Sequence, residues 1–282
     1  MKDRGAVLAV RIVSGIIGIA VAAFVIQTGG AVFCAAVLLL ALTGWHEYTQ
    51  AFRHKNISPA YWSGMAAAVC FLGAAYLRRA DLLAAAVTVF SLWLMLQAVL
   101  FHRSFSVPQA LVSVAGVMYV GLPFAYLILL RFWHAGETVP TPMGEMEIGC
   151  AWFWLAMIGT WASDTFAYFS GFAFGKTKLC EELSPKKTRE GFYGGVVGTA
   201  VSVAAIGHSM GYAVWPMFAL GVAIALVATV GDLVESAVKR YTGIKDSGTL
   251  IPGHGGVLDR FDSAMYVIPF VYYFLRLMEA WG

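Results

Sequence analysis

Long apolar runs separated by short polar segments constrain this chain more than any other feature. Runs long enough to cross ~30 Å of hydrocarbon as helices recur about nine times. They cover residues 10–27, 31–45, 61–77, 82–101, 110–130, 151–174, 193–213, 215–236 and 261–276. The chain is 60% hydrophobic and 12% charged, whereas roughly a quarter of a soluble domain is charged. We therefore predict an all-α polytopic membrane protein. Residues 1–282 would form one integral membrane domain, with N-terminal helices over 1–130 and a second group of helices and polar loops over 151–276.

The basic residues predict the orientation of these helices. If the helices alternate across the bilayer, the side that holds the N-terminus receives Lys2, Arg4, Arg11, Arg53, Lys55, Arg103, Lys176, Lys178, Lys186, Lys187, Arg189, Lys239, Arg240, Lys245 and Arg260. The other side receives only Arg78, Arg79, Arg131 and Arg276. Because cytoplasmic loops are enriched in Lys and Arg, we expect a cytoplasmic N-terminus and a C-terminus outside. A net charge of +3 is too small to indicate a nucleic-acid partner.

The polar stretch from Gly231 to Ser263 concentrates charge between two apolar runs. Its charged residues are Asp232, Glu235, Asp246, Asp259 and Asp262, with Lys239, Arg240, Lys245 and Arg260. Helical spacing places Asp232, Glu235, Ser236 and Lys239 on one face. Asp259 and Asp262, three residues apart, are expected to share a face at the start of the last helix. Carboxylate clusters select hard cations such as Mg²⁺, so Asp232, Asp259 and Asp262 are the predicted metal ligands.

A second polar loop, Gly175 to Phe192, carries cations and hydroxyls close together. Ser184, Lys186, Lys187 and Thr188 fall within one short segment, followed by Gly191, Gly194 and Gly195. Lysines with flanking hydroxyls suit phosphate oxygens, and glycines let a backbone approach a ligand. The alternative is a Lys-rich loop that only fixes topology.

Asp164 is predicted to lie well inside the run 151–174, next to Ser163. An ionised carboxylate in hydrocarbon costs several kcal/mol and usually faces a polar cavity. We therefore predict that Asp164 and Ser163 border a binding cavity. A protonated, Ser-paired structural aspartate is the alternative. His254, in the glycine-rich turn Pro252–Gly256, either contacts phosphate or holds the turn.

Together these residues favour transfer at a phosphoanhydride beside a membrane. Carboxylates that can hold Mg²⁺ lie in the same stretches as Lys and Arg cations, and no Walker A motif is present. The candidate catalytic residues are Lys239, Arg240, Lys245, Arg260 and Asp246. The candidate substrate-binding residues are Ser163, Asp164, Ser184, Lys186, Lys187, Thr188, Ser236 and His254. Because the loops are predicted at the membrane surface, one substrate is expected to be a lipid.

The residues from Ser236 to Asp262 resemble the signature of phosphatidate cytidylyltransferases, also called CDP-diacylglycerol synthases. They read SAVKR, four residues, KDS, four residues, then PGHGGVLDRFD. The preceding GDLVES, the SDTFAYFSG run, GKTKL and SPKKT with EG are also similar to that family. RIVSGIIG at Arg11 and the later Glu47 resemble its N-terminal pattern. The resemblance therefore extends over nearly the whole chain.

The resemblance implies a membrane enzyme that converts CTP and phosphatidic acid to CDP-diacylglycerol and pyrophosphate. It also implies Mg²⁺, in some members a monovalent cation such as K⁺ beside it, and a homodimer. The expected location is the inner membrane of a bacterial cell, with the active site facing the cytoplasm. Asp232 and Asp259 match the family's metal-binding aspartates most closely, with Asp262 and Asp246 as companions.

Two other classes remain open at this point. A secondary transporter would use Asp164 as an intramembrane ion site, although the polar residues gather at one surface rather than at the midplane. Another CTP-using membrane enzyme, such as a polyprenol kinase or a cytidylyltransferase for a different lipid phosphate, would share the same site chemistry. The pattern DGxxAR of CDP-alcohol phosphotransferases is absent from the sequence.

Overall fold

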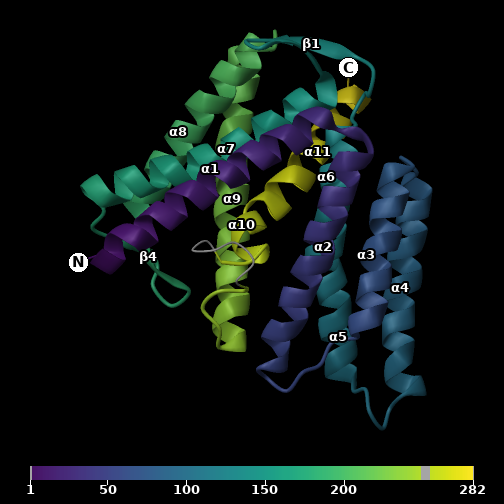
Figure 1. Ribbon diagram of the computed structural model, residues 1–282. Coiled ribbons are helices and arrows are strands. Elements are labelled where there is room, and N and C mark those ends of the chain that lie inside the picture. Colours follow the sequence, from purple (N-terminus) through teal and green to yellow (C-terminus); the bar gives the residue numbers. More distant parts are fainter. Residues whose placement is uncertain (1, 249–254, 282) are drawn as a thin grey trace. The chain divides into compact units, whose positions relative to one another are not determined.

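The computed structural model describes residues 2–248 and 255–281, with side chains over 15–248 and 255–280. The chain is mostly helical, as predicted, with two short β-hairpins (Figure 1). The helices are α1 (Lys2–Thr28), α2 (Gly30–Arg53), α3 (Tyr61–Tyr76), α4 (Ala80–Leu100), α5 (Val107–Gly116), the π-helical turn η1 (Val117–Gly121), α6 (Leu122–Arg131), α7 (Ile148–Phe174), α8 (Arg189–Ser209), α9 (Val214–Thr242), α10 (Leu258–Phe261) and α11 (Ala264–Trp281). The hairpins pair β1 (Thr138–Thr141) with β2 (Gly144–Glu147) and β3 (Lys178–Cys180) with β4 (Ser184–Thr188), both antiparallel.

Each predicted apolar run overlaps helix in the described part of the chain. Four helical stretches are long and apolar enough to cross a membrane by length and composition: Gly30–Arg53, Ala80–Leu100, Val107–Arg131 and Val214–Thr242. The third of these combines α5, η1 and α6. A membrane-type helical protein is therefore supported, whereas crossing by the remaining runs stays a prediction.

Two predicted boundaries are wrong, and both lie near the candidate site. The second run does not end at residue 45, because α2 continues to Arg53 and includes Glu47. The last run is interrupted: α10 ends at Phe261, and α11 begins at Ala264. Asp262 lies in the turn between them, where its Oδ1 accepts a hydrogen bond of 2.6 Å from the Ser263 N–H. Such local side-chain bonds compete with helix formation. Asp259 lies in α10 and Asp262 lies after it, so the prediction that they share a helix face is wrong.

The chain forms two compact units, each made of two segments. Unit 1 comprises Met1–Leu129 and Lys239–Phe261, and unit 2 comprises Leu130–Val238 and Asp262–Gly282. Helix α9 belongs to unit 2 up to Val238, and its last turn belongs to unit 1. The candidate residues are therefore divided between the two units.

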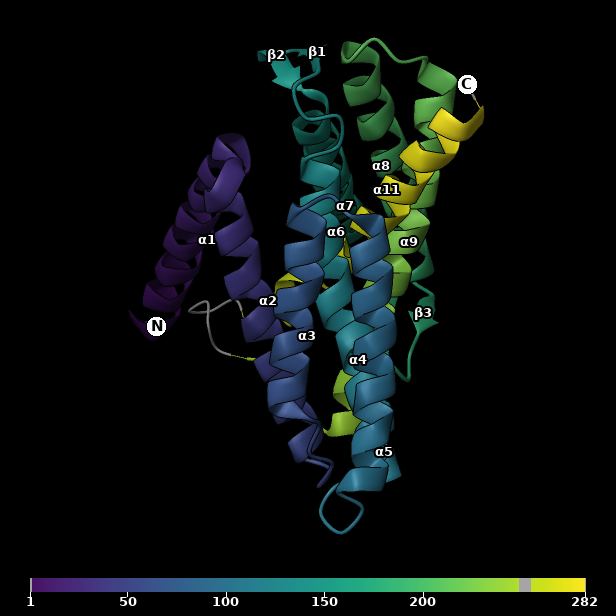
Figure 2. The same ribbon diagram turned by 90° about the vertical axis from the view of Figure 1, so that its right-hand side faces the viewer.

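The core of unit 1 is built around a buried tryptophan on α2. Trp45 is 1% exposed and stacks on Tyr48, and its Nε1–H donates to the Tyr61 carbonyl at 2.8 Å. Helices α3 and α4 lie side by side in this unit (Figure 2). Gly64 of α3 and Gly116 of α5 make room for the indole, because a Cβ at either position would overlap the Trp45 ring.

Unit 2 is organised by the close approach of α7 and α8 (Figure 1). A Cβ at Gly194 would overlap Ser170, and one at Gly198 would overlap Phe166. At Gly195 it would lie 3.0 Å from the Ser163 carbonyl oxygen. Gly194 and Gly195 therefore let the two helices pack closely, and the phosphate-approaching role predicted from the sequence stays a prediction.

We predict that Gly64→Ala destabilises the protein, whereas Gly73→Ala on the same helix does not. The methyl group at position 64 meets the Trp45 ring, and such overpacking costs about 1–3 kcal/mol. A Cβ at Gly73 meets no atom within 4 Å, so alanine there should stabilise the helix by up to ~1 kcal/mol. Thermal unfolding of both variants in detergent measures the difference. Equal melting temperatures would contradict this account of the core.

Candidate functional site

Unit 2 contains a cavity of about 400 Å³ that collects several predicted site residues. It is lined by Ser163, Asp164, Ala167, Tyr168, Gly171 and Phe172 of α7, Leu179, Lys186, Lys187 and Thr188 of the β3–β4 hairpin, Gly191 and Phe192 of α8, and Thr229 and Asp232 of α9. Residues from four separate parts of the sequence thus surround one space. Asp164 lies on this wall and is exposed, as its position within an apolar helix predicted.

The β3–β4 hairpin carries the lysines to the cavity. The Lys178 ammonium donates to the Pro185 carbonyl at 2.5 Å across the hairpin. The Glu190 carboxylate accepts hydrogen bonds from the Lys176 and Thr177 N–H groups at 3.1–3.2 Å. Its own backbone N–H and these two amides lower the pKa of Glu190 to about 2. The carboxylate is therefore ionised at neutral pH and holds the start of the hairpin.

Thr188 joins the hairpin to helix α8. It is the N-cap residue of α8, and its Oγ1 accepts a hydrogen bond of 3.1 Å from the Gly191 N–H. This bond satisfies one of the amides that a helix start leaves without a partner. Thr188 therefore has a structural role in addition to lining the cavity. Ser184 lies at the start of β4 opposite Cys180, and the described cavity lining does not include it.

An ion pair crosses the cavity between the hairpin and α9. The Lys187 Nζ lies 2.5 Å from Asp232 Oδ2, and the two side chains are 27% and 26% exposed. The Ser236 hydroxyl contacts the other carboxylate oxygen, Oδ1, at 3.4 Å. Ser236 lies one turn after Asp232 on α9, which confirms the predicted helical spacing. Asp232 is thus held between a cation and a hydroxyl of its own unit.

Sequence reasoning missed the aromatic wall of this cavity. Tyr168 and Phe172 are 66% and 83% exposed and stack on one another one turn apart on α7. Their spacing of four residues places them on the helix face that also carries Asp164. That repeat was visible in SDTFAYFSGF as a continuation of the Asp164 face. The cavity therefore combines charged groups with an exposed apolar surface.

We predict that Lys187 and Asp232 stabilise the fold jointly in the absence of substrate. A double-mutant cycle with Lys187→Gln and Asp232→Asn should give a coupling of about 0.5–1 kcal/mol in unfolding free energy, as partly exposed pairs do. The matched cycle uses Lys186→Gln with Asp232→Asn, because Lys186 lines the same cavity without this ion pair. Equal coupling in both cycles would refute the specific pairing.

Unit 1 contains the other candidate group, in the segment that follows α9. Asp259 of α10 accepts hydrogen bonds from three directions. The Lys239 ammonium lies 2.9 Å from its Oδ1, and the Ser247 and Gly256 N–H groups each donate to Oδ2 at 2.8 Å. The Asp259 side chain is only 7% exposed. Asp259 therefore holds together the end of α9, the bend at Ser247 and the residue Gly256. The sequence did not predict this structural role.

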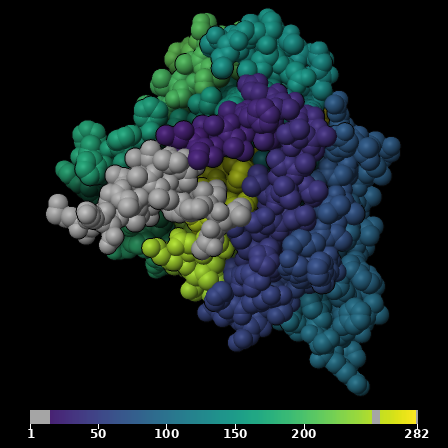
Figure 3. Space-filling view, in the orientation of Figure 1, coloured from purple at the N-terminus to yellow at the C-terminus, as the bar shows by residue number. Residues whose placement is uncertain are grey.

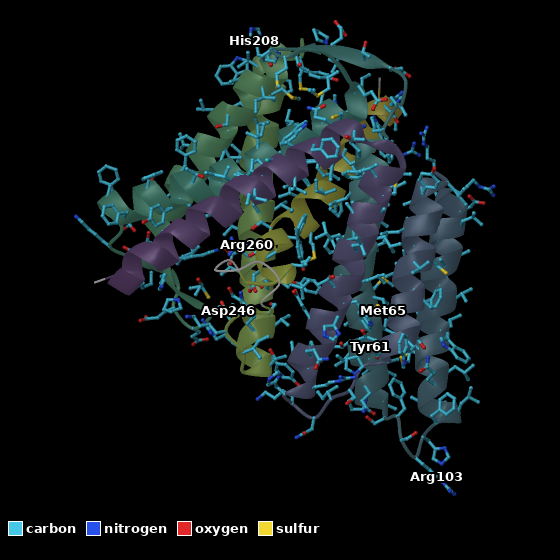
Figure 4. The ribbon with its side chains drawn as sticks, viewed as in Figure 1. Tyr61, Met65, Arg103, His208, Asp246 and Arg260 are labelled. Atoms are coloured by element: carbon cyan, nitrogen blue, oxygen red, sulfur yellow. The ribbon has the colours of Figure 1, made fainter. Side chains whose placement is uncertain are left out.

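The remaining candidates of unit 1 are charged and exposed. Arg240 lies in the last turn of α9, and its side chain is exposed. Figure 3 shows the end of this helix at the surface in yellow-green. Lys245 and Asp246 follow in the bend after the helix, and Arg260 projects from α10 (Figure 4). His254 lies outside the described residues. These cations are accessible to an anionic ligand.

Glu47 is a further residue of this group that the sequence analysis did not place at the site. It is 5% exposed, and its carboxylate accepts hydrogen bonds from the Val257 and Leu258 N–H groups. Because the second apolar run was predicted to end at residue 45, Glu47 was assigned to a polar connection. A single acidic residue continuing an apolar helix was the signal that could have identified it.

The donor set fits a hard cation, with substrate or water supplying part of the coordination. The predicted ligands Asp232, Asp259 and Asp262 offer only oxygen atoms, which Mg²⁺ prefers. Among the residues that the structure describes, no three His, Cys, Asp or Glu side chains form a metal-binding group. Mg²⁺ typically keeps several waters or substrate phosphates among its six ligands, so a complete protein cage is not required.

These features define a class of protein: an α-helical membrane-type protein whose lysine and aspartate groups suit phosphate-bearing ligands beside an apolar surface. Comparison with known sequences makes the class specific. The sequence profile of the cytidylyltransferase family matches residues 9–278, and the chain belongs to that family.

Three relatives illustrate the similarity. A phosphatidate cytidylyltransferase from Synechocystis is 36% identical over 297 residues, which cover 95% of this chain and 96% of the relative. One from Staphylococcus haemolyticus is 31% identical and covers 92% of this chain and 96% of its own length. The chloroplastic phosphatidate cytidylyltransferase 5 of Arabidopsis thaliana is 34% identical, with 93% of this chain and 70% of the relative covered. The family resemblance seen in the motifs is thus confirmed.

Proposed function

We propose that this protein transfers CMP from CTP to phosphatidic acid, producing CDP-diacylglycerol and pyrophosphate. The observation that carries the proposal is the unit 2 cavity, where Lys186 and Lys187 meet an exposed aromatic wall. A phosphate that is attached to acyl chains needs this combination of cations and apolar surface. Membership of the cytidylyltransferase family and relatives named as phosphatidate cytidylyltransferases support the choice of substrates.

The reaction needs positioning and charge stabilisation more than proton transfer. A phosphate oxygen of the lipid attacks the α-phosphorus of CTP, and a new P–O bond forms. The bond from the α-phosphorus to the bridging oxygen breaks in line, and pyrophosphate leaves with the electron pair. The lipid phosphate is already anionic at neutral pH, so this mechanism requires no general base.

Lysine and arginine side chains of unit 1 and of unit 2 stabilise the negative charge that develops on the phosphate oxygens during the transfer. Lys186 and Lys187 contact phosphate in the cavity, while Lys239, Arg240 and Arg260 bind the triphosphate and the leaving group. Such preorganised groups are typically worth a few kcal/mol each in the transition state. Lys245 and Asp246 border the nucleotide. Ser163, Asp164, Ser184, Thr188, Ser236 and His254 complete the proposed substrate contacts.

Asp232, Asp259 and Asp262 are the proposed ligands of Mg²⁺. When bound, this ion neutralises phosphate charge and orients the triphosphate. The donor chemistry of these residues supports this assignment, and a monovalent cation such as K⁺ beside Mg²⁺ is proposed from the family resemblance.

We also propose that the protein crosses the inner membrane of a bacterial cell about nine times and functions as a homodimer. The N-terminus and the site would face the cytoplasm, and the C-terminus would lie outside. The distribution of Lys and Arg between the connections supports this orientation. The four helices long enough to span a bilayer support the membrane location.

The decisive assay incubates the purified protein with CTP labelled in its cytidine, phosphatidic acid and Mg²⁺. We expect label in the lipid phase and release of one pyrophosphate per labelled lipid. Asp232→Asn and Asp259→Asn should each lower kcat by more than about tenfold, equivalent to ~1.4 kcal/mol. Chelation of divalent metal should abolish the transfer.

The control variant is Glu145→Gln, which makes the same acid-to-amide change at an exposed position of β2. It should keep full activity. Polyprenyl phosphate offered in place of phosphatidic acid tests the rival acceptor. Transfer to that lipid alone would overturn the proposed acceptor, and a fully active Asp232→Asn would remove Asp232 from the proposed metal site.

We predict opposite locations for the two chain ends. Single cysteines placed at position 2 and position 282 are labelled with a membrane-impermeant thiol reagent in intact cells and in inverted vesicles. An odd number of crossings should expose position 282 in intact cells and position 2 in inverted vesicles. A variant lacking both engineered cysteines gives the background. Labelling of both ends from one side would contradict the proposed number of crossings.

A further inference from the structure

Glu47 is a buried carboxylate in the apolar helix α2 and has no part in the proposed chemistry. It is 5% exposed, and it lies on the same helix as the buried Trp45 and Tyr48. Burying a carboxylate is costly unless hydrogen-bond donors meet it. The donors that meet Glu47 come from a segment more than 200 residues away: the separation is 210 residues for Val257 and 211 for Leu258.

The contact uses both oxygens of the carboxylate. The Val257 N–H donates to Oε1 and the Leu258 N–H donates to Oε2, each at 2.9 Å. These amides are at the start of α10, where a helix leaves N–H groups without intrahelical partners. Bonds from amides to an ionised acceptor are stronger than neutral ones. One side chain of α2 thus satisfies two adjacent backbone donors of unit 1.

Two glycines leave the space that this contact requires. A Cβ at Gly248 or Gly256 would overlap the Glu47 carboxylate. The Gly256 N–H donates to Asp259 Oδ2. The three consecutive amides of residues 256–258 are therefore all bound by carboxylates, the first by Asp259 and the next two by Glu47. Asp259 also accepts a hydrogen bond from the Lys239 ammonium. The same short segment therefore contacts both Glu47 and Lys239, which is one of the proposed catalytic cations.

We propose that Glu47 is a positioning residue for the transfer reaction. By clamping the amides of Val257 and Leu258, it fixes α10, and with it the Lys239–Asp259 pair and Arg260. This inference rests on the proposed function. Glu47 does not line the described cavity, and its proposed effect on the reaction is transmitted through the segment that it holds.

The first test measures the clamp itself and needs no activity. Hydrogen exchange of residues 255–261 is followed by mass spectrometry in the full-length protein in detergent. Glu47→Gln, which keeps the shape but loses the charge, should speed exchange of these amides about tenfold or more. Thr49→Val is the matched control, because Thr49 is also buried on α2 and its hydroxyl donates to the His46 carbonyl of the same helix. It should leave this exchange unchanged.

The second test measures the consequence for the reaction. Glu47→Gln should lower kcat/KM for CTP about tenfold, while the KM for phosphatidic acid changes less than about twofold. Thr49→Val should keep normal kinetics. A general loss of folding would instead lower the active fraction and leave both KM values unchanged.

A double-mutant cycle separates positioning from simple damage. Gly256→Ala should impair activity because its methyl group meets the carboxylate of Glu47. Glu47→Asp shortens the side chain by one methylene and makes room, so Gly256→Ala should cost at least about threefold less in that background. Additive losses would show that the two residues do not act through this contact and would overturn the proposal.

The outcomes distinguish this inference from the proposed function. Normal exchange at residues 255–261 in Glu47→Gln overturns the clamp, whatever the enzyme does. Fast exchange with wild-type kinetics shows a clamp without a positioning role, which also overturns the proposal. If the wild-type protein transfers no CMP but the exchange result holds, the proposed function fails while the contact is confirmed.

Discussion

A carboxylate inside an apolar protein must find donors, and this requirement organises the polar part of both units. In unit 1, Glu47 binds two backbone amides, and Asp259 binds two amides and the Lys239 ammonium. In unit 2, Asp232 binds the Lys187 ammonium. The cost of burying a charge is several kcal/mol unless such partners are present. The backbone amides of residues 256–258 and the two lysines are therefore required by the fold itself.

Close helix packing provides the frame on which unit 2 holds its charges. The glycines of α8 let α7 approach closely, and Thr188 caps α8 at the point where the hairpin begins. Lys187 immediately precedes this cap, so its backbone is fixed by the helix that follows. Asp232 lies on α9, a helix of 29 residues. Side chains placed on such rigid elements are held more accurately than side chains on free loops.

The sequence predicted the helices and the charged residues of the cavity, Asp164, Lys186, Lys187 and Asp232, because both depend on local patterns. Apolar runs mark helices, and the helical repeat put Asp232 and Ser236 on one face. It failed where long-range contacts decide. Glu47 gains its hydrogen-bond partners from amides that are distant in sequence. The interruption between α10 and α11 was missed for a local reason: the Asp262 carboxylate accepts a hydrogen bond from the neighbouring Ser263 N–H there. The close packing of Gly194 and Gly198 against α7 could not be predicted, because a sequence does not show which neighbour a missing Cβ admits.

The ion pairs impose a condition on substrate binding in the proposed reaction. Lys187 and Lys239 are bound by Asp232 and Asp259, so neither lysine can bind a phosphate fully without giving up part of its ion pair. A nucleotide arriving alone would leave each aspartate beside an unshielded anion. A nucleotide that arrives together with a divalent cation would bring a new partner for each member of an ion pair. The phosphate would pair with the lysine, and the metal would pair with the aspartate. Charge is then balanced before and after binding, which keeps the desolvation cost low. In the proposed reaction, these ion pairs would therefore favour a metal–nucleotide complex over either component alone.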